Sequence, residues 1–199
     1  MWYIKVMKED LIKLRHARSA KDFPEIDLEE GEFVELAIRR SKKGLILIWA
    51  AEAVGFVVVS LILILFLNGD GTSGIFNLDE AAKGYLYLVI FVLYVALATS
   101  GLVGTFVYKN NLLVITNQRA IQKIRSNLLA SSMNIIDLGS IEDVSFHKSG
   151  AFDYLFHLGT IRMSTVGDET TYTFPYVDTP RDEIKTISSL VHRVKSKKD

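Results

Sequence analysis

Residues 45–67, LILIWAAEAVGFVVVSLILILFL, and residues 85–107, YLYLVIFVLYVALATSGLVGTFV, are two apolar stretches of 23 residues each. Glu52 is the only acidic or basic side chain in either stretch. A helix of about 20 apolar residues is long enough to cross the hydrocarbon core of a bilayer. The sequence therefore predicts an integral membrane protein with two spanning helices and polar segments before and after them.

The composition of the whole chain excludes several other classes of protein. Of 199 residues, 49% are hydrophobic, and 23 Lys and Arg balance 23 Asp and Glu, so the formal net charge is zero. This balance argues against a dedicated nucleic-acid binder, whose affinity depends on a basic surface. The absence of cysteine excludes a disulfide-stapled secreted domain, thiol catalysis and cysteine-ligated zinc or iron–sulfur sites.

Shifts in composition divide the chain into five segments. These are a polar N-terminal segment (1–43), a first transmembrane helix (44–67), an extracytoplasmic loop (68–84), a second transmembrane helix (85–108) and a polar tail (109–199). The first apolar stretch begins more than 40 residues into the chain, so we expect an anchor and not a cleavable signal peptide. The tail, with about 90 residues, is long enough for one small domain.

The distribution of basic residues predicts the orientation in the membrane. Arg39, Arg40, Lys42 and Lys43 lie directly before the first span, and the first basic residues after the second span are Lys109, Arg119, Lys123 and Arg125. The loop between the spans has a single basic residue, Lys83, and three acidic ones. Because Lys and Arg are enriched on the cytoplasmic side, we expect both termini in the cytoplasm and the loop outside.

Small residues recur along both spans at a spacing of four. Ala51 and Gly55 lie on the first span, and Ala96, Ser100 and Gly104 lie on the second. Small residues allow membrane helices to approach closely. The pattern predicts helix packing, either between the two spans of one chain or between two copies of the chain.

Glu52 is the only acidic residue in the two spans. It lies eight residues after Gly44, which is about 12 Å along a helix that rises about 1.5 Å per residue. Acidic residues inside a membrane usually face protein or mark a function. Thr99 and Ser100 of the second span lie at a matching depth and can hydrogen-bond it. We interpret Glu52 as a packing residue, with an ion or proton pathway as the alternative.

The tail changes to short stretches with the alternation of antiparallel strands. Strands are predicted at 112–116, 120–125, 133–138, 141–146, 159–165 and 171–176. A helical period follows, with Thr179 as N-cap, Pro180 in the first position, and five apolar residues on one face: Ile184, Ile187, Leu190, Val191 and Val194. The predicted fold is a membrane α-helical hairpin joined to an α+β, mainly β domain, an antiparallel barrel or sandwich capped by the C-terminal helix.

Several short motifs stand in a defined order around and after the spans. They are Gly31-Glu32, Arg39-Arg40, the run Leu113–Arg119, the run Ile136–Val144, Gly159-Thr160-Ile161 and Pro180. In these motifs the chain, over about residues 25–192, resembles the bacterial pleckstrin-homology (PH) domain proteins in which a PH-like domain follows two membrane spans. The resemblance implies a seven-stranded, strongly bent sheet capped by a C-terminal helix, and it implies no defined reaction.

The resemblance also directs attention to the first hairpin of the tail, residues 112–125. Lipid-binding PH domains of eukaryotes hold inositol phosphates with a basic cluster in their first hairpin. Here the hairpin departs from that pattern, because its only cations are Arg119, Lys123 and Arg125, and we do not expect a specific inositol-phosphate pocket. They form the candidate lipid- or anion-binding site, because basic residues near a membrane surface attract anionic lipid by about 1 kcal/mol each. The alternative is three solvated strand residues.

The N-terminal segment contains a second candidate surface. Residues 2–18 predict a basic amphipathic helix, which can lie on a membrane surface, pack on the tail domain or fray. Phe23-Pro24 ends it. We expect the acidic run 25–35, which is interleaved with apolar residues, to add a strand or to cover the tail domain.

No arrangement typical of catalysis or metal binding is evident. The four histidines, His16, His147, His157 and His192, have no metal-ligand spacing, although a paired site at His147 and His157 is left open. Asp143 and Asp153 are interpreted as turn or cap residues. We therefore expect no catalytic residue, no metal, no cofactor and no small-molecule substrate.

These patterns, together with what the resemblance implies, predict a non-enzymatic protein of the bacterial inner membrane. It would present a PH-like domain at the cytoplasmic face as a scaffold that binds protein or lipid headgroups. The expected partners are membrane lipids and either a protein partner or a second copy. The alternatives are a small transport or channel component that uses Glu52, and a membrane-stress signalling accessory.

Overall fold

The computed structural model describes residues 2–67, 79–166, 171–178 and 181–198, which form two compact units. The first unit comprises residues 1–41, 110–126 and 130–199, and the second comprises residues 42–109 and 127–129. The first unit is therefore built from sequence on both sides of the apolar stretches. The predicted N-cap Thr179 and the neighbouring Pro180 lie outside the described residues, as does most of the predicted loop at 68–84.

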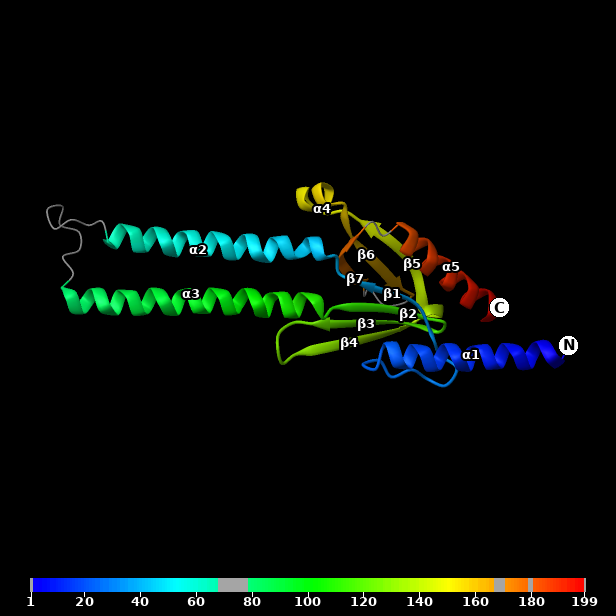
Figure 1. The fold of residues 1–199 in the computed structure, drawn as a ribbon. Helices are drawn as coiled ribbons and strands as arrows, with labels where there is room; N and C mark the ends of the chain where they lie inside the picture. The colour runs from blue at the N-terminus through cyan, green and yellow to red at the C-terminus, as the bar shows by residue number, and fades with distance from the viewer. Residues whose placement is uncertain (1, 68–78, 167–170, 179–180, 199) are drawn as a thin grey trace. The chain divides into compact units, whose positions relative to one another are not determined.

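The second unit is a pair of long apolar helices. The 3-10 turn η1 (Lys42–Gly44) leads into α2 (Leu45–Leu67), and α3 (Glu80–Lys109) runs back beside it (Figure 1). Both helices are long and apolar enough to cross a membrane. Large apolar side chains such as Val57 and Phe91 are exposed along them, which is a surface suited to hydrocarbon.

The first unit contains two antiparallel sheets. The four-stranded sheet has the order β1 (Val34–Arg39), β2 (Leu112–Thr116), β3 (Arg119–Arg125), β4 (Ser131–Asp137), and the three-stranded sheet has the order β5 (Ile141–His147), β6 (Leu158–Thr165), β7 (Thr171–Asp178). The prediction of antiparallel sheet is confirmed, but a closed barrel is wrong. The sheets stay separate because the chain leaves β4 through the 3-10 turn η2 (Leu138–Ser140) and no ladder joins β4 to β5 among the described residues.

Strand β1 precedes the helical hairpin in the sequence, whereas the other strands of its sheet follow the hairpin. It pairs with β2 in an antiparallel register that sets Arg39 opposite Leu112 and Ile38 opposite Leu113. Residues 40–111, which include both apolar helices, thus form the connection between two neighbouring strands. The acidic run 25–35 was expected to add a strand or to cover the tail domain, and the structure shows both. Its last residues belong to β1, and its first residues pack on the sheet.

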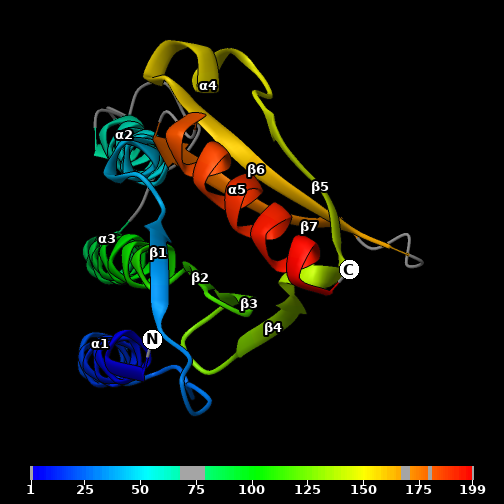
Figure 2. The same cartoon turned by 90° about the vertical axis from the view of Figure 1, so that its right-hand side faces the viewer.

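The two sheets and helix α5 (Arg181–Lys198) share one core. Ile115 of β2, Phe174 of β7 and Ile187 of α5 are among its fully buried members. Figure 2 shows α5 lying along the three-stranded sheet, where its apolar stripe closes the core. Side chains alternate between the two faces of β2, and Leu113 and Ile115 face this core.

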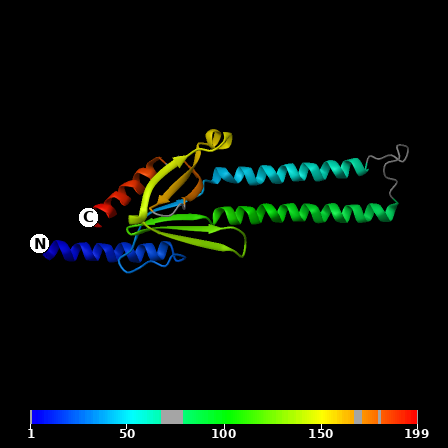
Figure 3. The ribbon, with the colours of Figure 1, turned by 180° about the vertical axis from the view of Figure 1, so that it is seen from behind.

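The other face of the four-stranded sheet is covered by the N-terminal segment. Leu112, Val114 and Ile121 form a second cluster with Ile26, against which Phe23, Leu28 and Val34 pack. Helix α1 (Trp2–Asp22) precedes this segment and lies against β1 (Figure 3). Strand β2 is therefore buried on both faces, as its uninterrupted apolar sequence requires.

A short helix, α4 (Ala151–Phe156), connects β5 to β6. The carboxylate of Asp153 accepts a hydrogen bond from the Ser149 amide at 2.9 Å, which is the turn-stabilising role predicted for it. After α4 the chain enters β6 through Gly159, where a Cβ atom would collide with the ring of Phe146. Glycine is thus required for Phe146 to close this end of the sheet.

Candidate binding site

Glu32 is the centre of a densely connected polar cluster in the first unit. Gly31 precedes it with a φ of 78°, in the left-handed region that glycine adopts without steric cost. This turn directs Glu32 inward, and the residue is 0% exposed. A carboxylate so far from water needs several donors around it.

Arg119 supplies two of these donors from the start of β3. Its Nε lies 2.9 Å from Oε1 of Glu32, and its Nη2 lies 2.8 Å from Oε2. The guanidinium and the carboxylate are therefore paired in the bidentate geometry that makes such bonds strong. A third nitrogen, Nη1, lies 2.9 Å from the carboxylate of Glu29, and the Arg119 side chain is 17% exposed.

Thr116 and the backbone complete the shell of Glu32. The Thr116 hydroxyl donates to Oε1 at 2.6 Å, and the Glu29 amide donates to Oε2 at 2.8 Å. Burial alone would raise the pKa of Glu32, but the hydrogen bonds from Arg119, Thr116 and the Glu29 amide outweigh it and lower this pKa below its ordinary value. Glu32 thus stays ionised, and the hydrogen bond to Glu32 raises the pKa of Arg119.

The turn between β2 and β3 holds the segment before β1 at a second point. Oδ1 of Asn117 accepts a hydrogen bond from the Phe33 amide at 3.0 Å, and the Asn117 amide group donates to the Gly31 carbonyl at 3.3 Å. Glu32, Thr116, Asn117 and Arg119 together are named the Glu32 clamp. The clamp joins residues from before the helical hairpin to residues from after it.

Helix α1 is attached to the same segment by side chains on its inner face. Nδ1 of His16 lies 2.6 Å from the carbonyl oxygen of Glu32, and the Ser19 hydroxyl accepts a hydrogen bond from the Val34 amide at 3.0 Å. Ser19 is buried. The outcome expected as one of three for the amphipathic helix, packing on the domain, is the one observed.

The three cations predicted as an anion site do not share one environment. Arg119 belongs to the Glu32 clamp, and the Lys123 ammonium pairs with the carboxylate of Glu25. The Arg125 amide donates to Oδ1 of Asn111 at 3.2 Å. An anionic headgroup at Arg119 or Lys123 would have to compete with a carboxylate already in place.

An apolar groove opens next to the clamp. It has a volume of about 580 Å³ and lies between α1, β1 and α5. Its lining residues are Met7, Leu11, Ile12, Arg15, Phe33, Glu35, Asn117, Leu190, Arg193 and Val194. Asn117 belongs to both features, so the Glu32 clamp positions one wall of the groove.

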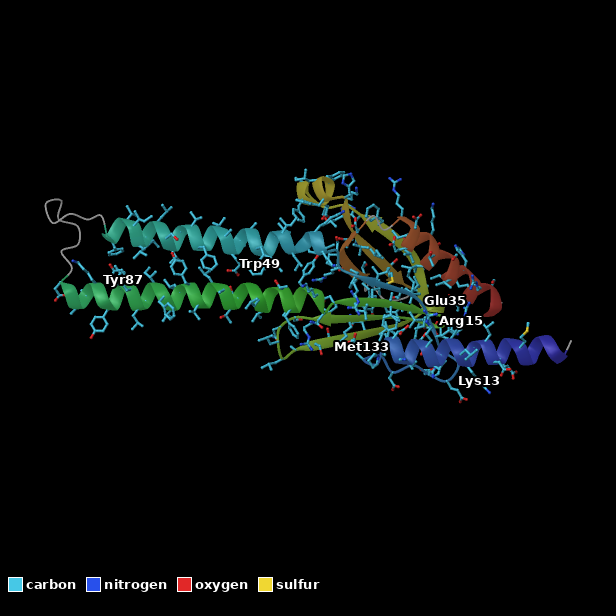
Figure 4. All side chains as sticks on the ribbon, viewed as in Figure 1. Lys13, Arg15, Glu35, Trp49, Tyr87 and Met133 are labelled. Atoms are coloured by element: carbon cyan, nitrogen blue, oxygen red, sulfur yellow. The ribbon has the colours of Figure 1, made fainter. Side chains whose placement is uncertain are left out.

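Three charged side chains, those of Arg15, Glu35 and Arg193, are among the residues that line the groove. The Arg15 guanidinium lies over the ring of Phe33, 5.2 Å from its centroid. Arg193 of α5 lies 3.9 Å from the carboxylate of Glu35 on β1. Figure 4 labels Arg15 and Glu35, which reach this region from different elements. A groove that is lined by apolar side chains and by charges of both signs suits a peptide segment better than a small anion.

In the helical unit, the structure brings two of the three predicted intramembrane polar residues together. The Ser100 hydroxyl donates to Oε1 of Glu52 at 2.6 Å. Thr99 instead donates to the Val95 carbonyl of its own helix, at 2.7 Å. A pair that sequence analysis did not predict lies further along the helices, where the hydroxyl groups of Ser60 and Tyr94 are 2.6 Å apart.

The predicted small residues divide into two groups. A Cβ on Gly55 would lie 2.9 Å from Leu97, and one on Gly104 would lie 3.3 Å from Ile48, so both glycines face the other helix of the pair. Ala51 and Ala96 are exposed. Gly101, which was not predicted, is buried against Glu52 and Trp49.

Three comparisons with known proteins complete the description. No family model and no curated protein matches the chain. Two solved structures are similar. The first is a pleckstrin homology domain from Shewanella amazonensis SB2B, with 18% sequence identity and a TM-score of 0.34, and the match covers 41% of this chain and 67% of that chain. The second is a DUF1696 family protein with a pleckstrin-homology domain from Shewanella loihica PV-4, with 15% sequence identity and a TM-score of 0.32, and the match covers 43% of this chain and 70% of that chain.

Proposed function

We propose that the chain is a non-enzymatic protein of a bacterial inner membrane that holds a PH-like scaffold at the cytoplasmic surface. Helices α2 and α3 would be the two spans, and the first unit would be the scaffold. The observation that carries the proposal is the pairing of β1 with β2, which sets Arg39 opposite Leu112.

This pairing supports a two-span topology. Strands joined in one ladder must lie on the same side of a membrane, and these two strands flank the two apolar helices in sequence. An even number of spans satisfies that condition. The basic residues on both flanks, including Lys42 and Lys109, favour the cytoplasm as that side.

The arrangement of the first unit supports a PH-like scaffold. Seven antiparallel strands and a C-terminal helix are present, although the strands form a four-stranded and a three-stranded sheet and not the single bent sheet that the resemblance in sequence implies. The scaffold would be attached to the spans by only a few residues at each end, Arg40–Ser41 with η1 before α2, and Asn110–Asn111 after α3. Such short links raise its effective concentration for partners at the membrane.

We infer that the primary ligand of the scaffold is a protein segment that occupies the groove between α1, β1 and α5. The groove is lined by apolar side chains, including Leu11 and Leu190, and by the charged side chains of Arg15 and Glu35. The candidate headgroup site is less available, because Arg119 and Lys123 already have carboxylate partners.

The membrane part of the proposal is tested with single-cysteine variants, which are unambiguous because the chain has no cysteine. In spheroplasts, an impermeant maleimide should label the Ser73→Cys variant and leave the Glu30→Cys variant unlabelled until the cells are lysed. Labelling of both variants, or of neither, before lysis contradicts the two-span topology.

The binding part is tested in membranes of the native host with a photo-crosslinking amino acid. Leu11 lines the groove, whereas Leu14 is an exposed leucine on the same helix outside it. Protein adducts should form from position 11 and not from position 14. Equal labelling from the two positions, or lipid adducts alone, contradicts a groove-bound protein.

A further inference from the structure

The turn between β3 and β4 exposes two leucines in succession. Leu128 is 49% exposed and Leu129 is 99% exposed. The turn is closed by a hydrogen bond from the Ser126 amide to the Ala130 carbonyl at 3.2 Å, and Oδ1 of Asn127 accepts from the Leu129 amide at 2.9 Å. The tip is thus a formed turn that presents apolar side chains where turns usually carry polar ones.

The chain places this turn next to the end of α3. Asn110 and Asn111 are the only residues between α3 and β2, so Lys109 lies within about 7 Å of Asn111 at about 3.6 Å per residue. Oδ1 of Asn111 accepts a hydrogen bond from the Arg125 amide. The last residue of β3 is therefore tied to the short link that leaves α3.

The register of the sheet gives the direction in which the turn extends. Leu112, the first residue of β2, is paired with Lys123 of β3. Because the strands are antiparallel, β3 continues past the start of β2, toward the side from which the chain arrives out of α3. Ser126 lies about 10 Å beyond the level of Leu112, at about 3.3 Å per residue. Residues 127–129 accordingly belong to the same compact unit as α2 and α3.

We propose that Leu128 and Leu129 insert into the interfacial layer of the bilayer that α2 and α3 cross, which gives the scaffold a third contact with the membrane. This inference rests on the proposed function. The charge around the links agrees with it, because Arg39, Lys42 and Lys109 are exposed there and attract anionic headgroups. An apolar tip among cations is the combination that binds membrane interfaces.

A third contact changes what the scaffold can do. Two links a few residues long join the first unit to α2 and α3, and rotation within these links would allow the unit to tilt. Insertion of the turn on the same sheet removes this freedom, because β3 is paired to β2 along its length. The groove between α1, β1 and α5 would then keep a constant orientation toward the membrane.

The test measures depth with single-cysteine variants of the full chain, labelled with the polarity-sensitive fluorophore NBD and reconstituted in phosphatidylcholine–phosphatidylglycerol vesicles. Leu129→Cys reports on the turn. Gln118→Cys, at the opposite end of β3, is the matched aqueous control, about 23 Å away along the strand. Val57→Cys, exposed in the middle of α2, reports on the span itself.

Nitroxide lipids with the quencher near the headgroup should quench the probe of the Leu129→Cys variant strongly, with a blue-shifted emission, and should leave that of Gln118→Cys unchanged. If the Val57→Cys probe is quenched by deep nitroxides but the Leu129→Cys probe behaves like the aqueous control, the inference is overturned and the membrane topology stands. If the Val57→Cys probe is not quenched either, the proposed function fails, and this inference fails with it.

Discussion

Glu32 is fully buried and Glu52 is half-buried, and their surroundings differ in the number of hydrogen-bond donors. Each oxygen of Glu32 accepts two hydrogen bonds, from Thr116, Arg119 and the Glu29 amide. Glu52 accepts one, from Ser100, and its Oε2 is buried without a hydrogen bond among the described residues. Burial alone therefore does not measure what a carboxylate contributes to a fold.

The difference follows from the backbone around each residue. The turn before β1 and the turn after β2 leave amides and side chains available for Glu32, as the Glu29 amide shows. In α2 and α3 the amides are used within the helices, so Glu52 depends on side chains of the neighbouring helix. We therefore expect the Glu32 clamp to dominate stability and the Glu52–Ser100 pair to contribute little.

The largest effect is expected for Glu32→Ala, which leaves Arg119 without its main partner in a largely buried position. Loss of one member of a buried ion pair costs about 3 kcal/mol of unfolding free energy. Thermal unfolding of the full chain in detergent, followed by circular dichroism, measures the change. The control is Glu30→Ala, an exposed neighbour, for which a change within about 0.5 kcal/mol is expected. Equal effects of the two substitutions would contradict the clamp.

Arg119→Lys should have a smaller effect, because the charge remains while the bidentate geometry is lost. One hydrogen bond to a charged group contributes about 1.5 kcal/mol. The same unfolding experiment applies, with Arg193→Lys as the control. Arg193 is mostly exposed at 3.9 Å from Glu35, so its replacement should change stability very little. A larger loss of unfolding free energy for Arg193→Lys than for Arg119→Lys would contradict the stabilising role assigned to Arg119.

Acid should weaken the clamp without any substitution. The pKa of Glu32 is lowered in the folded state from an ordinary value of 4.5, so the unfolded chain takes up its proton first as the pH falls. The contribution of Glu32 is therefore complete above about pH 4.5 and declines as the pH falls toward its folded pKa. Unfolding of Glu32→Gln should show a shallower loss of stability with acid than the unsubstituted chain. Parallel pH profiles would contradict this account.

The smallest effect is expected in the helical unit. Ser100→Ala removes the single hydrogen bond to Glu52, and interhelical hydrogen bonds in membranes average about 0.6 kcal/mol. Unfolding in mixed micelles of increasing SDS content measures it. Thr99→Ala is the matched control, because among the described residues the Thr99 hydroxyl donates to Val95 of its own helix and not to Glu52. If Ser100→Ala lowered the unfolding free energy as much as Glu32→Ala, the expected contrast between Glu32 and Glu52 would be wrong.

Local patterns in the sequence were sufficient to predict much of the architecture. Period-two alternation predicted the strands after α3, and the apolar stripe of Ile187, Leu190 and Val191 predicted the core-facing side of α5. The separation of the sheets was not predictable, because it depends on η2 turning the chain between β4 and β5. Alternation shows that a strand has a buried face but does not show which strand lies beside it.

The candidate site depended on pairings that no local pattern contains. Gly31-Glu32 and Thr116–Arg119 were both noticed as motifs, but 84 residues separate Glu32 from Thr116 and the spans intervene. The signal that was available is chemical: an apolar-flanked Glu after a glycine on one side, and a Thr-Asn-Gln-Arg turn with matching donors on the other. The groove was even harder to predict from the sequence, because it is formed by residues of α1, β1 and α5, which lie far apart in the chain.

The insertion of residues 40–111 between β1 and β2 has a consequence for biogenesis. The ribosome releases β1 before either helix, and β2 emerges only after both, roughly 4–14 s later at about 5–20 residues per second. During that interval β1 has no ladder partner, and an unpaired strand edge is prone to wrong association. If α2 and α3 span a membrane as proposed, the sheet can close only after the translocation machinery has returned the chain to the starting side. Completion of the ladder would then serve as a check that the hairpin has been inserted correctly.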